Sequence, residues 1–253
     1  MAMILNEEQT MLKDSAKDFC TTNTPIGQLR KMRDEANADG FDRGSWSSMV
    51  ELGWAAIPWG EEHGGLAFGY KGLGVVTEES GRTLTASPLY ASVWVGGTLI
   101  NLAGSEAQKA ELLPRLAAGE MLLALALEES HKHDPYGVGT TATASGDGYT
   151  LDGKKTFVLD GHVADKLLVV ARTSAEVGSR QGLSLFMVDR EAAGLSVTRT
   201  LMADSRNAAN IVLEGVQVNS DALIGEADQA ADALDQALDL SLIHISEPTR
   251  LAE

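Results

Sequence analysis

The chain has 253 residues, enough for two ordinary domains that each bury a core. Apolar residues make up 44% of the sequence and charged residues 22%, which is typical of soluble globular proteins and excludes the disordered, collagen-like and membrane classes. The formal net charge of -16 would repel a phosphate backbone, and no cluster of Lys and Arg opposes it. We therefore exclude nucleic acid as a partner.

The sequence shows no secretory or membrane-spanning pattern and contains a single cysteine. The N-terminal residues lack the basic start and apolar run of a secretory signal, and no stretch reaches the ~20 apolar residues of a spanning helix. We therefore expect a cytoplasmic protein without membrane insertion. Cys20 is the only cysteine, which excludes an intrachain disulfide and a thiolate zinc site. We expect Cys20 to be a small hydrophobic residue within a helix.

Helical patterns occupy the first 120 residues. Asn6 with Gln9, and Ser105 with Gln108, have the spacing of capping boxes, and each pair precedes apolar residues at helical intervals. Pro114 lies near the end of the second of these helices and is expected to stop or bend it. Further helices are predicted over residues 46–52 and 70–81.

From Met121 the pattern changes to short runs rich in Val, Leu, Thr and Phe, separated by turn residues. Glycines at 146 and 148, and Gly153 after Asp152, stand where tight hairpins need a positive φ. The regular spacing predicts an all-β domain, either a barrel or a sandwich. The predicted strands cover residues 122–127, 140–144, 155–159, 166–171, 183–188 and 210–213.

After Gly225 the sequence returns to a helical composition that is rich in acidic residues. No Lys or Arg occurs between Arg206 and Arg250, so we expect this helix to pack against a partner with basic residues that is missing from this chain. The final stretch, SLIHISEPTRLAE, abandons the acidic amphipathic pattern and resembles a translated vector sequence. An ordinary unstructured terminus is the alternative. We expect the segment 241–253 to make few contacts with the rest.

Three segments carry a family resemblance. They are LGWAAIPWGEEHGGLAFGY from Leu52, EESGRTLTASPLY from Glu78 and GSEAQKAELLPRLAAGE from Gly104. In this order and spacing they resemble the N-terminal helical domain of acyl-CoA dehydrogenases. The resemblance continues through LDGKKTFVLDGHVADKLLVVART, GLSLFMVDREAAGLSV and NIVLEGVQVNSDALIGE, and so covers residues 1 to about 240.

The resemblance implies an α+β fold, with an N-terminal helical domain followed by a β-barrel middle domain. In the family a further helical domain follows and usually supplies the catalytic base. Catalysis and full flavin binding would then depend on residues beyond this match, so we expect this chain alone to bind FAD weakly or not at all and to be inactive. The expected parts are residues 1–120, 121–222, a partial helical domain at 223–240 and a non-native tail at 241–253.

The family resemblance also implies a cofactor, a substrate and partners. The cofactor is FAD, and the parent enzyme would be a CH-CH oxidoreductase of lipid metabolism that converts an acyl-CoA to a 2,3-enoyl-CoA. An electron-accepting flavoprotein and a homo- or hetero-oligomer are the expected partners. The resemblance places the flavin against two strands, at Leu125, Leu127 and Glu128 of the first and Phe157, Val158 and Leu159 of the second.

The sequence departs from the family at both flavin segments. The family has Thr-Glu-Pro before a glycine-rich loop, where this chain has Glu128-Glu129-Ser130 followed by HKHDPYG. The family often has Trp-Ile-Thr where Phe157, Val158 and Leu159 stand, so an aromatic ring is kept and a hydroxyl is lost. Such versions resemble subfamilies that act on unusual acyl-CoAs, including subunits of heteromeric dehydrogenases.

A dense titratable cluster follows the first of these strands. Glu128, Glu129 and Asp134, with His131 and His133, could supply a local base or imitate a metal triad. Acids are also ordinary on loops, and no further metal ligand is evident. Because the family places its base in the later domain, we assign neither a catalytic residue nor a metal site to this chain.

Three functions remain open from the sequence. The first is an FAD-dependent acyl-CoA dehydrogenase of which this chain is part. The second is a non-catalytic subunit or fragment that completes the flavin site of a heteromeric dehydrogenase. The third is a module that binds CoA thioesters without redox chemistry, which bound flavin would exclude.

Overall fold

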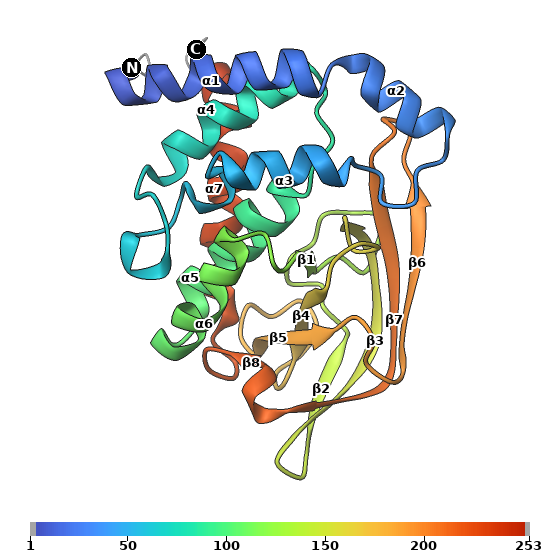
Figure 1. The fold of residues 1–253 in the computed structure, drawn as a ribbon. Coiled ribbons are helices and arrows are strands. Elements are labelled where there is room, and N and C mark those ends of the chain that lie inside the picture. Colours follow the sequence, from blue (N-terminus) through green and yellow to red (C-terminus); the bar gives the residue numbers. More distant parts are fainter. Residues whose placement is uncertain (1–3, 251–253) are drawn as a thin grey trace.

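The computed structural model describes residues 4–250, with side chains through residue 240. Helices fill the first half of the chain, as expected, and lie above and to the left of most of the strands in Figure 1. These are α1 (Glu7–Asn23), α2 (Ile26–Asp34), α3 (Arg43–Glu51), α4 (Gly69–Arg82), the π-helical segment η3 (Leu89–Gly97), α5 (Thr98–Ala103) and α6 (Glu106–Ala117), with short 3-10 turns η1 (Trp54–Ala56) and η2 (Glu61–His63).

Both predicted capping boxes form. The Asn6 side chain accepts a hydrogen bond from Gln9 N at 2.8 Å, and the Gln9 side chain accepts one from Asn6 N. Ser105 and Gln108 exchange the same pair of bonds at the start of α6. These bonds satisfy backbone donors that the first turn of a helix leaves unpaired, and so fix where each helix begins.

The β domain confirms the predicted order of a helical domain followed by strands, but its sheet is not a closed barrel. The strand order is β6-β7-β3-β2-β4-β5-β8, with β1 added beside β4, and no pairing between β6 and β8 closes it within residues 4–250. The strands are β1 (Leu123–Ala126), β2 (Thr141–Ser145), β3 (Gly148–Leu159), β4 (Lys166–Arg172), β5 (Leu183–Asp189), β6 (Leu195–Leu201), β7 (Asn207–Asn219) and β8 (Leu223–Ile224), with the 3-10 turn η4 (Ser220–Ala222) before β8.

One of the two predicted hairpin turns is present. Gly146 adopts a φ of 59° in the turn between β2 and β3, where Ser145 pairs with Gly148. Gly153 instead lies inside β3, at a register shift against β7. A Cβ at Gly153 would stand 2.3 Å from Thr140 Oγ1, so the glycine permits a close backbone approach at a bulge and makes no hairpin.

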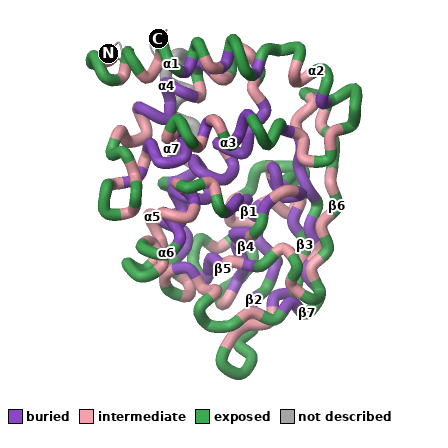
Figure 2. The backbone as a smooth tube through the Cα atoms, in the orientation of Figure 1, coloured by how far each residue is buried: buried purple, intermediate pink, exposed green. Residues whose placement is uncertain are grey.

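The helical and β domains share one hydrophobic core. Leu123 of β1, Leu168 of β4 and Leu185 of β5 are buried in the same cluster as Trp54 and Leu99 of the helical domain. The purple segments of Figure 2 accordingly continue from the helices into these strands. A second cluster is formed by the alternate residues of β1, β4 and β5, such as Leu167 and Phe186, together with residues of β2, β3 and β7. The helices are therefore held on one face of the β1–β4–β5 region by apolar burial.

Long strands connect the second domain to the far end of the first. Figure 1 shows β6 and β7 reaching up to α2. There the guanidinium of Arg199 in β6 donates to the carbonyl oxygens of Asn37 and Ala38, each at 2.7 Å. These bonds and the shared core hold the two domains at both ends.

The last described element is helix α7 (Ala230–Arg250), which packs against α5 and β5. Its backbone continues through the first ten residues of the segment 241–253 that we expected to be a non-native tail. The side chains of 241–250 and all of residues 251–253 lie outside the described part of the structure, so the expected lack of contacts is not tested. Within the described part, none of the helices has the length and apolar character needed to cross a bilayer.

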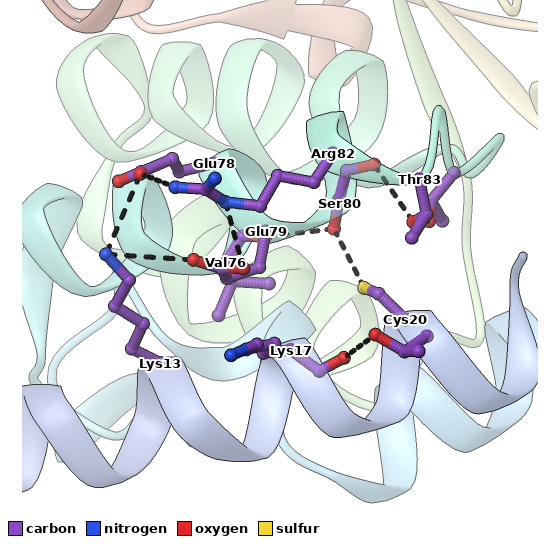
Figure 3. Close-up of polar contacts among 11 residues, drawn as sticks. Lys13, Lys17, Cys20, Val76, Glu78, Glu79, Ser80, Arg82 and Thr83 are labelled. Atoms are coloured by element: carbon purple, nitrogen blue, oxygen red, sulfur yellow. Dashed lines mark hydrogen bonds and ion pairs between the residues drawn. The ribbon is translucent and has the colours of Figure 1, made fainter.

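Polar groups fix α1 against α4, as Figure 3 shows. The Glu79 carboxylate is 2% exposed and lies 3.1 Å from Arg82 Nε and 3.7 Å from Lys13 Nζ of α1. Cys20 is buried on α1, as predicted, with its sulfur 3.7 Å from the Ser80 hydroxyl. Glu78 makes similar ion pairs from an exposed position. The buried carboxylate is thus the member of this cluster that has exchanged most of its contact with water for Arg82 and Lys13.

We expect Glu79→Gln to lower the free energy of unfolding by about 1–3 kcal/mol, since it removes the charge that Arg82 and Lys13 face at a buried site. Glu78→Gln is the matched control and should cost less than about 1 kcal/mol because that pair is solvated. Urea unfolding of both variants measures the difference. Equal losses of unfolding free energy in the two variants would show that the buried Glu79 carboxylate contributes no more than the exposed Glu78 carboxylate.

Candidate functional site

A cavity of about 140 Å³ opens where the two domains meet, and we call it the shelf pocket. Five of the six residues predicted to contact flavin line it: Leu125 and Leu127 near β1, Glu128 after it, and Phe157 and Leu159 on β3. The opposite wall comes from η3 and α7, through Tyr90, Ala91, Val95 and Leu238, with His133 at the edge. The predicted residues therefore converge on one cavity.

Phe157 owes its position to an irregularity in β3. The pairing of β3 with β7 shifts between Lys155 and Val158, and Phe157 adopts a φ of 54° within this bulge. A positive φ is strained for a bulky residue, and bulges re-aim side chains. The result is an aromatic side chain that lines the shelf pocket and remains 57% exposed.

Val158 is the one predicted contact that does not line the shelf pocket. It is 1% exposed and belongs to the core among the strands. Neighbouring residues of a strand point to opposite faces, so Val158 faces inward while Phe157 and Leu159 line the pocket. Val158 therefore packs in the core on the opposite side of β3 from the shelf pocket.

Glu128 is bound to the loop that follows it. Its Oε1 lies 2.6 Å from His133 Nδ1, and its Oε2 accepts a hydrogen bond from Asp134 N at 3.2 Å. The Glu128 carbonyl accepts a bond from Thr156 N of the bulge at 2.7 Å. The Glu128 side chain is therefore paired with the loop after β1, and its backbone carbonyl links that loop to β3.

Glu129 forms a buried ion pair with Lys155. Lys155 Nζ donates to Glu129 Oε1 at 2.7 Å and to the Leu127 carbonyl at 3.1 Å, and its side chain has no exposed surface. Backbone N–H groups of Gly139 and Thr140 also donate to the Glu129 carboxylate. Burial lowers the pKa of Lys155 to about 8 against the attraction of Glu129. Burial raises the pKa of Glu129, but Lys155 and Thr140 outweigh it and the net pKa is lowered.

Asp134 and His131 are other titratable residues of this loop. Asp134 Oδ1 accepts a bond from Gly137 N and closes a turn. His131 and Asp134 are exposed. The described residues contain no group of three or more His, Cys, Asp or Glu arranged to hold a metal. Within the described residues, Asp134 is thus part of a loop turn, and no metal-ligand arrangement is present in this cluster.

Beyond Leu159, the turn after β3 carries a buried acid. Asp160 is 6% exposed, and the Arg206 guanidinium lies 3.4 Å from its carboxylate. Burial raises the pKa of Asp160 to about 6, and Arg206 opposes the shift only in part. This pair could not be predicted from the sequence, because the two residues are 46 positions apart.

The residues of the opposite wall were also missed. Tyr90, Ala91 and Val95 belong to η3, whose residues are buried almost all round, so no polar face marks it as a helix. Lys155 lies in a predicted strand, and its burial could not be predicted because a lysine in a strand is usually exposed. A charged residue within an apolar alternation was the one available signal.

The comparisons with known proteins agree with this architecture. The family model described as "Acyl-CoA dehydrogenase, N-terminal domain" matches residues 6–120, and the model described as "Acyl-CoA dehydrogenase, middle domain" matches residues 124–216. These matches divide the chain where the helices give way to strands. The fold and the site place this chain in a class of proteins that have a helical domain, a β domain and an apolar pocket between the two.

Individual relatives point the same way. The chain is 28% identical to the acyl-CoA dehydrogenase FadE29 of Mycobacterium tuberculosis over 89% of its own length and 58% of the relative. It is 27% identical to a 3-(aryl)acrylate reductase of Clostridium sporogenes, covering 90% of this chain and 60% of that one. A chain in the solved structure of the electron transferring flavoprotein of Acidaminococcus fermentans aligns with a TM-score of 0.83 and 27% identity, over 97% of this chain and 65% of that chain.

The chain belongs to the acyl-CoA dehydrogenase family. It spans about 60% of the length of the curated relatives described above.

We expect Glu129→Gln to destabilise the fold by roughly 3–5 kcal/mol, because it leaves the fully buried Lys155 ammonium without a counter-charge. Lys155→Met should cost less, since the Glu129 carboxylate keeps its two backbone N–H partners and some solvent. Denaturant unfolding compares the two variants. A larger loss for Lys155→Met would contradict this ranking.

Asp160→Asn should stabilise the protein in a pH-dependent way. Between the ordinary pKa of 3.8 and the folded value of about 6, the folded state holds a proton that the unfolded state has lost, so ionisation lowers stability as pH rises through this window. The variant avoids this cost and should gain at most about 3 kcal/mol near neutral pH, falling to nothing near pH ~4. Thermal unfolding across this range measures the gain. Asp204→Asn, at an exposed position, should show no such dependence.

Proposed function

We propose that this chain forms the flavin-binding and acyl-binding walls of an FAD-dependent acyl-CoA dehydrogenase, whose whole protein oxidises an acyl-CoA to a 2,3-enoyl-CoA. The observation that carries the proposal is the shelf pocket, in which residues from β1, β3, η3 and α7 meet between the two domains. Family membership supports the same reaction class. Each wall has a separate role in the proposal.

The β-domain wall suits a flat ring. Leu125, Leu127, Phe157 and Leu159 present apolar side chains, and the partly exposed Phe157 gives an aromatic face for stacking. A bound flavin would supply the acceptor for the hydride that leaves the β carbon of the acyl group. The hydroxyl that the family often offers at the position of Leu159 is missing, so polar contacts to the ring must come from backbone groups or from elsewhere in the protein.

The helical wall suits the acyl chain. Ala91 is small and Val95 apolar, so together they leave room for an alkyl group opposite the β strands, and Tyr90 borders it. Leu238 of α7 narrows the same space and keeps water out. An acyl group between these walls would present one face of its α–β bond to the ring. Exclusion of water there favours hydride transfer over side reactions.

We assign no base for proton removal to the described residues. Glu129 is engaged by Lys155 and two backbone donors, and Glu128 is bound to the loop after β1. A general base must be within hydrogen-bonding reach of the proton it takes and free to accept it. The base is therefore proposed to come from a segment or partner outside this match.

We further propose that the protein works as an oligomer with an electron-carrying flavoprotein. The similarity to a chain in an electron transferring flavoprotein structure supports such a partner. One relative is named as a 3-(aryl)acrylate reductase, and reduction is the reverse of the proposed oxidation. Assays should therefore test both oxidation and reduction.

A non-catalytic subunit is the second candidate. Glu128 brings a negative charge to the edge of the shelf pocket, which opposes formation of an anionic reduced ring, and the Leu159 position lacks a hydroxyl. Both features favour a chain that completes a flavin site whose chemistry is carried by another subunit. Turnover with an artificial electron acceptor, in the presence and absence of candidate partners, separates the two.

Titration of the 253-residue chain with FAD should show weak binding that depends on Phe157. We expect Phe157→Ala to weaken the affinity at least about fivefold, since stacking on an aromatic ring contributes roughly 1 kcal/mol or more. Leu201→Ala, at another exposed apolar residue, is the matched control and should leave the affinity unchanged. Quenching of flavin fluorescence measures both.

Equal FAD affinities of the two variants would show that Phe157 does not contact the flavin. Stoichiometric flavin with turnover by the chain alone would contradict the assignment of the base to another segment and return attention to Glu128 and Asp134.

A further inference from the structure

Helix α7 lines the shelf pocket through Leu238, but its packing face is smooth. Within the described side chains of α7, the buried residues are four alanines and one leucine: Ala230, Ala231, Ala233, Leu234 and Ala237. Small side chains bury little apolar area and interlock poorly with the ridges of a neighbouring element. Apolar packing therefore holds α7 against the protein but fixes its tilt only weakly.

The start of α7 is anchored at Asp228. Its carboxylate accepts hydrogen bonds from the hydroxyls of Thr173 at 2.6 Å and Ser174 at 2.8 Å, and its backbone N–H donates to the Ser184 hydroxyl at 2.7 Å. Leu238 lies about 12 Å beyond the first residue of the helix, and a pivot of about 10° at that end would move it by about 2 Å. This anchor alone therefore does not fix the wall of the pocket.

A second anchor lies two turns further along α7. Arg180, from the loop between β4 and β5, donates to Asp235 Oδ2 at 2.8 Å and also pairs with Asp232. The Tyr136 hydroxyl donates to the other oxygen of Asp235 at 2.6 Å. We call these four residues the α7 clamp. The bond to Asp235 raises the pKa of the Tyr136 hydroxyl, which therefore keeps its proton and remains a donor.

One buried guanidinium fixes both loops that carry the clamp. Arg172 is 6% exposed and donates to four backbone carbonyl oxygens, two on each loop. The acceptors, at 2.8–3.0 Å, are the carbonyls of Tyr136 and Val138 and those of Ser179 and Gln181. Because the N–H groups of a guanidinium lie in a fixed plane, these bonds hold the two loops in one relative position. The clamp side chains are therefore in place for α7.

The clamp joins two walls of the shelf pocket. Tyr136 belongs to the loop after β1, and His133 of that loop stands at the edge of the pocket. Leu238 lies one turn beyond Asp235 and lines the opposite wall. Release of the clamp would let α7 pivot and would move Leu238 relative to the β-domain wall.

We propose that Arg180 is a positioning residue, which sets the width of the shelf pocket through α7 and Leu238. Arg180 does not line the pocket, so it acts by holding Asp235. Its side chain is 50% exposed, and salt screens a solvated ion pair but leaves apolar packing intact. The width of the pocket therefore depends on ionic strength. Only the use of this pocket for flavin and acyl groups rests on the proposed function.

Leu238→Cys gives a direct readout of the wall. Cys20 is the only native cysteine and is 1% exposed, so N-ethylmaleimide reports mainly on the new thiol, and the unsubstituted chain gives the background rate. In the Leu238→Cys background, Arg180→Gln should raise the rate of modification about threefold to fivefold, the range for loss of a solvated ion pair. Arg180→Lys should restore part of the difference, because it keeps the charge and loses the planar fork. Circular dichroism should show all variants folded.

Lys166→Gln is the matched control. Lys166 of β4 pairs with Asp189 at 3.0 Å and takes no part in the clamp, so its loss should leave the rate unchanged. Raising NaCl from about 0.05 M to about 1 M should speed modification while Arg180 is present and have little effect in Arg180→Gln. The salt response distinguishes the clamp from a general loosening of the fold.

Equal rates in Arg180→Gln and Lys166→Gln, or a salt response that persists in Arg180→Gln, would overturn the proposal. The thiol measurement needs no flavin, so it is independent of the FAD titration. Faster modification in Arg180→Gln without any flavin binding would support the clamp and refute the proposed function alone. Flavin binding with unchanged thiol reactivity would refute the clamp alone.

Discussion

The shelf pocket depends on a single buried ion pair. Lys155 reaches from β3 to the Glu129 carboxylate and the Leu127 carbonyl just after β1, and so ties together the two strands that form the shelf. Burying the ammonium is costly, and the carboxylate at 2.7 Å with its two backbone donors offsets that cost. Because Glu129 is used in this way, the acid-rich segment after β1 fixes the position of the strands that line the pocket.

Much of the fold followed from local patterns in the sequence. Asn6 and Ser105 marked helix starts correctly because a capping box is a local hydrogen-bond pattern. Strand β6 was not predicted, since its outward residues give only a weak apolar alternation. Closure of the sheet was also expected and not found, because local alternation says which residues form strands but not whether the end strands meet.

The candidate site was predictable only where the family resemblance reached it. Leu125, Leu127, Glu128, Phe157 and Leu159 do share one pocket, but that knowledge came from similar sequences and not from periodicity. Long-range pairs left no sequence signal. The acidic residues of α7 are an example: we expected a basic surface elsewhere, and Arg180 of this same chain pairs with Asp232 and Asp235, while Tyr136 donates to Asp235 at 2.6 Å. Such partners are fixed by tertiary contact alone.

The bulge at Phe157 has a consequence for how this protein can change over time. A bulky residue at positive φ costs on the order of 1–3 kcal/mol, which the surrounding pairing of β3 and β7 must absorb. Selection for stability alone would replace it with glycine or asparagine, which tolerate that backbone. An aromatic ring at this position therefore costs stability that glycine or asparagine would not, and places a ring at the pocket. Stabilised versions of this chain should be sought by substitution elsewhere.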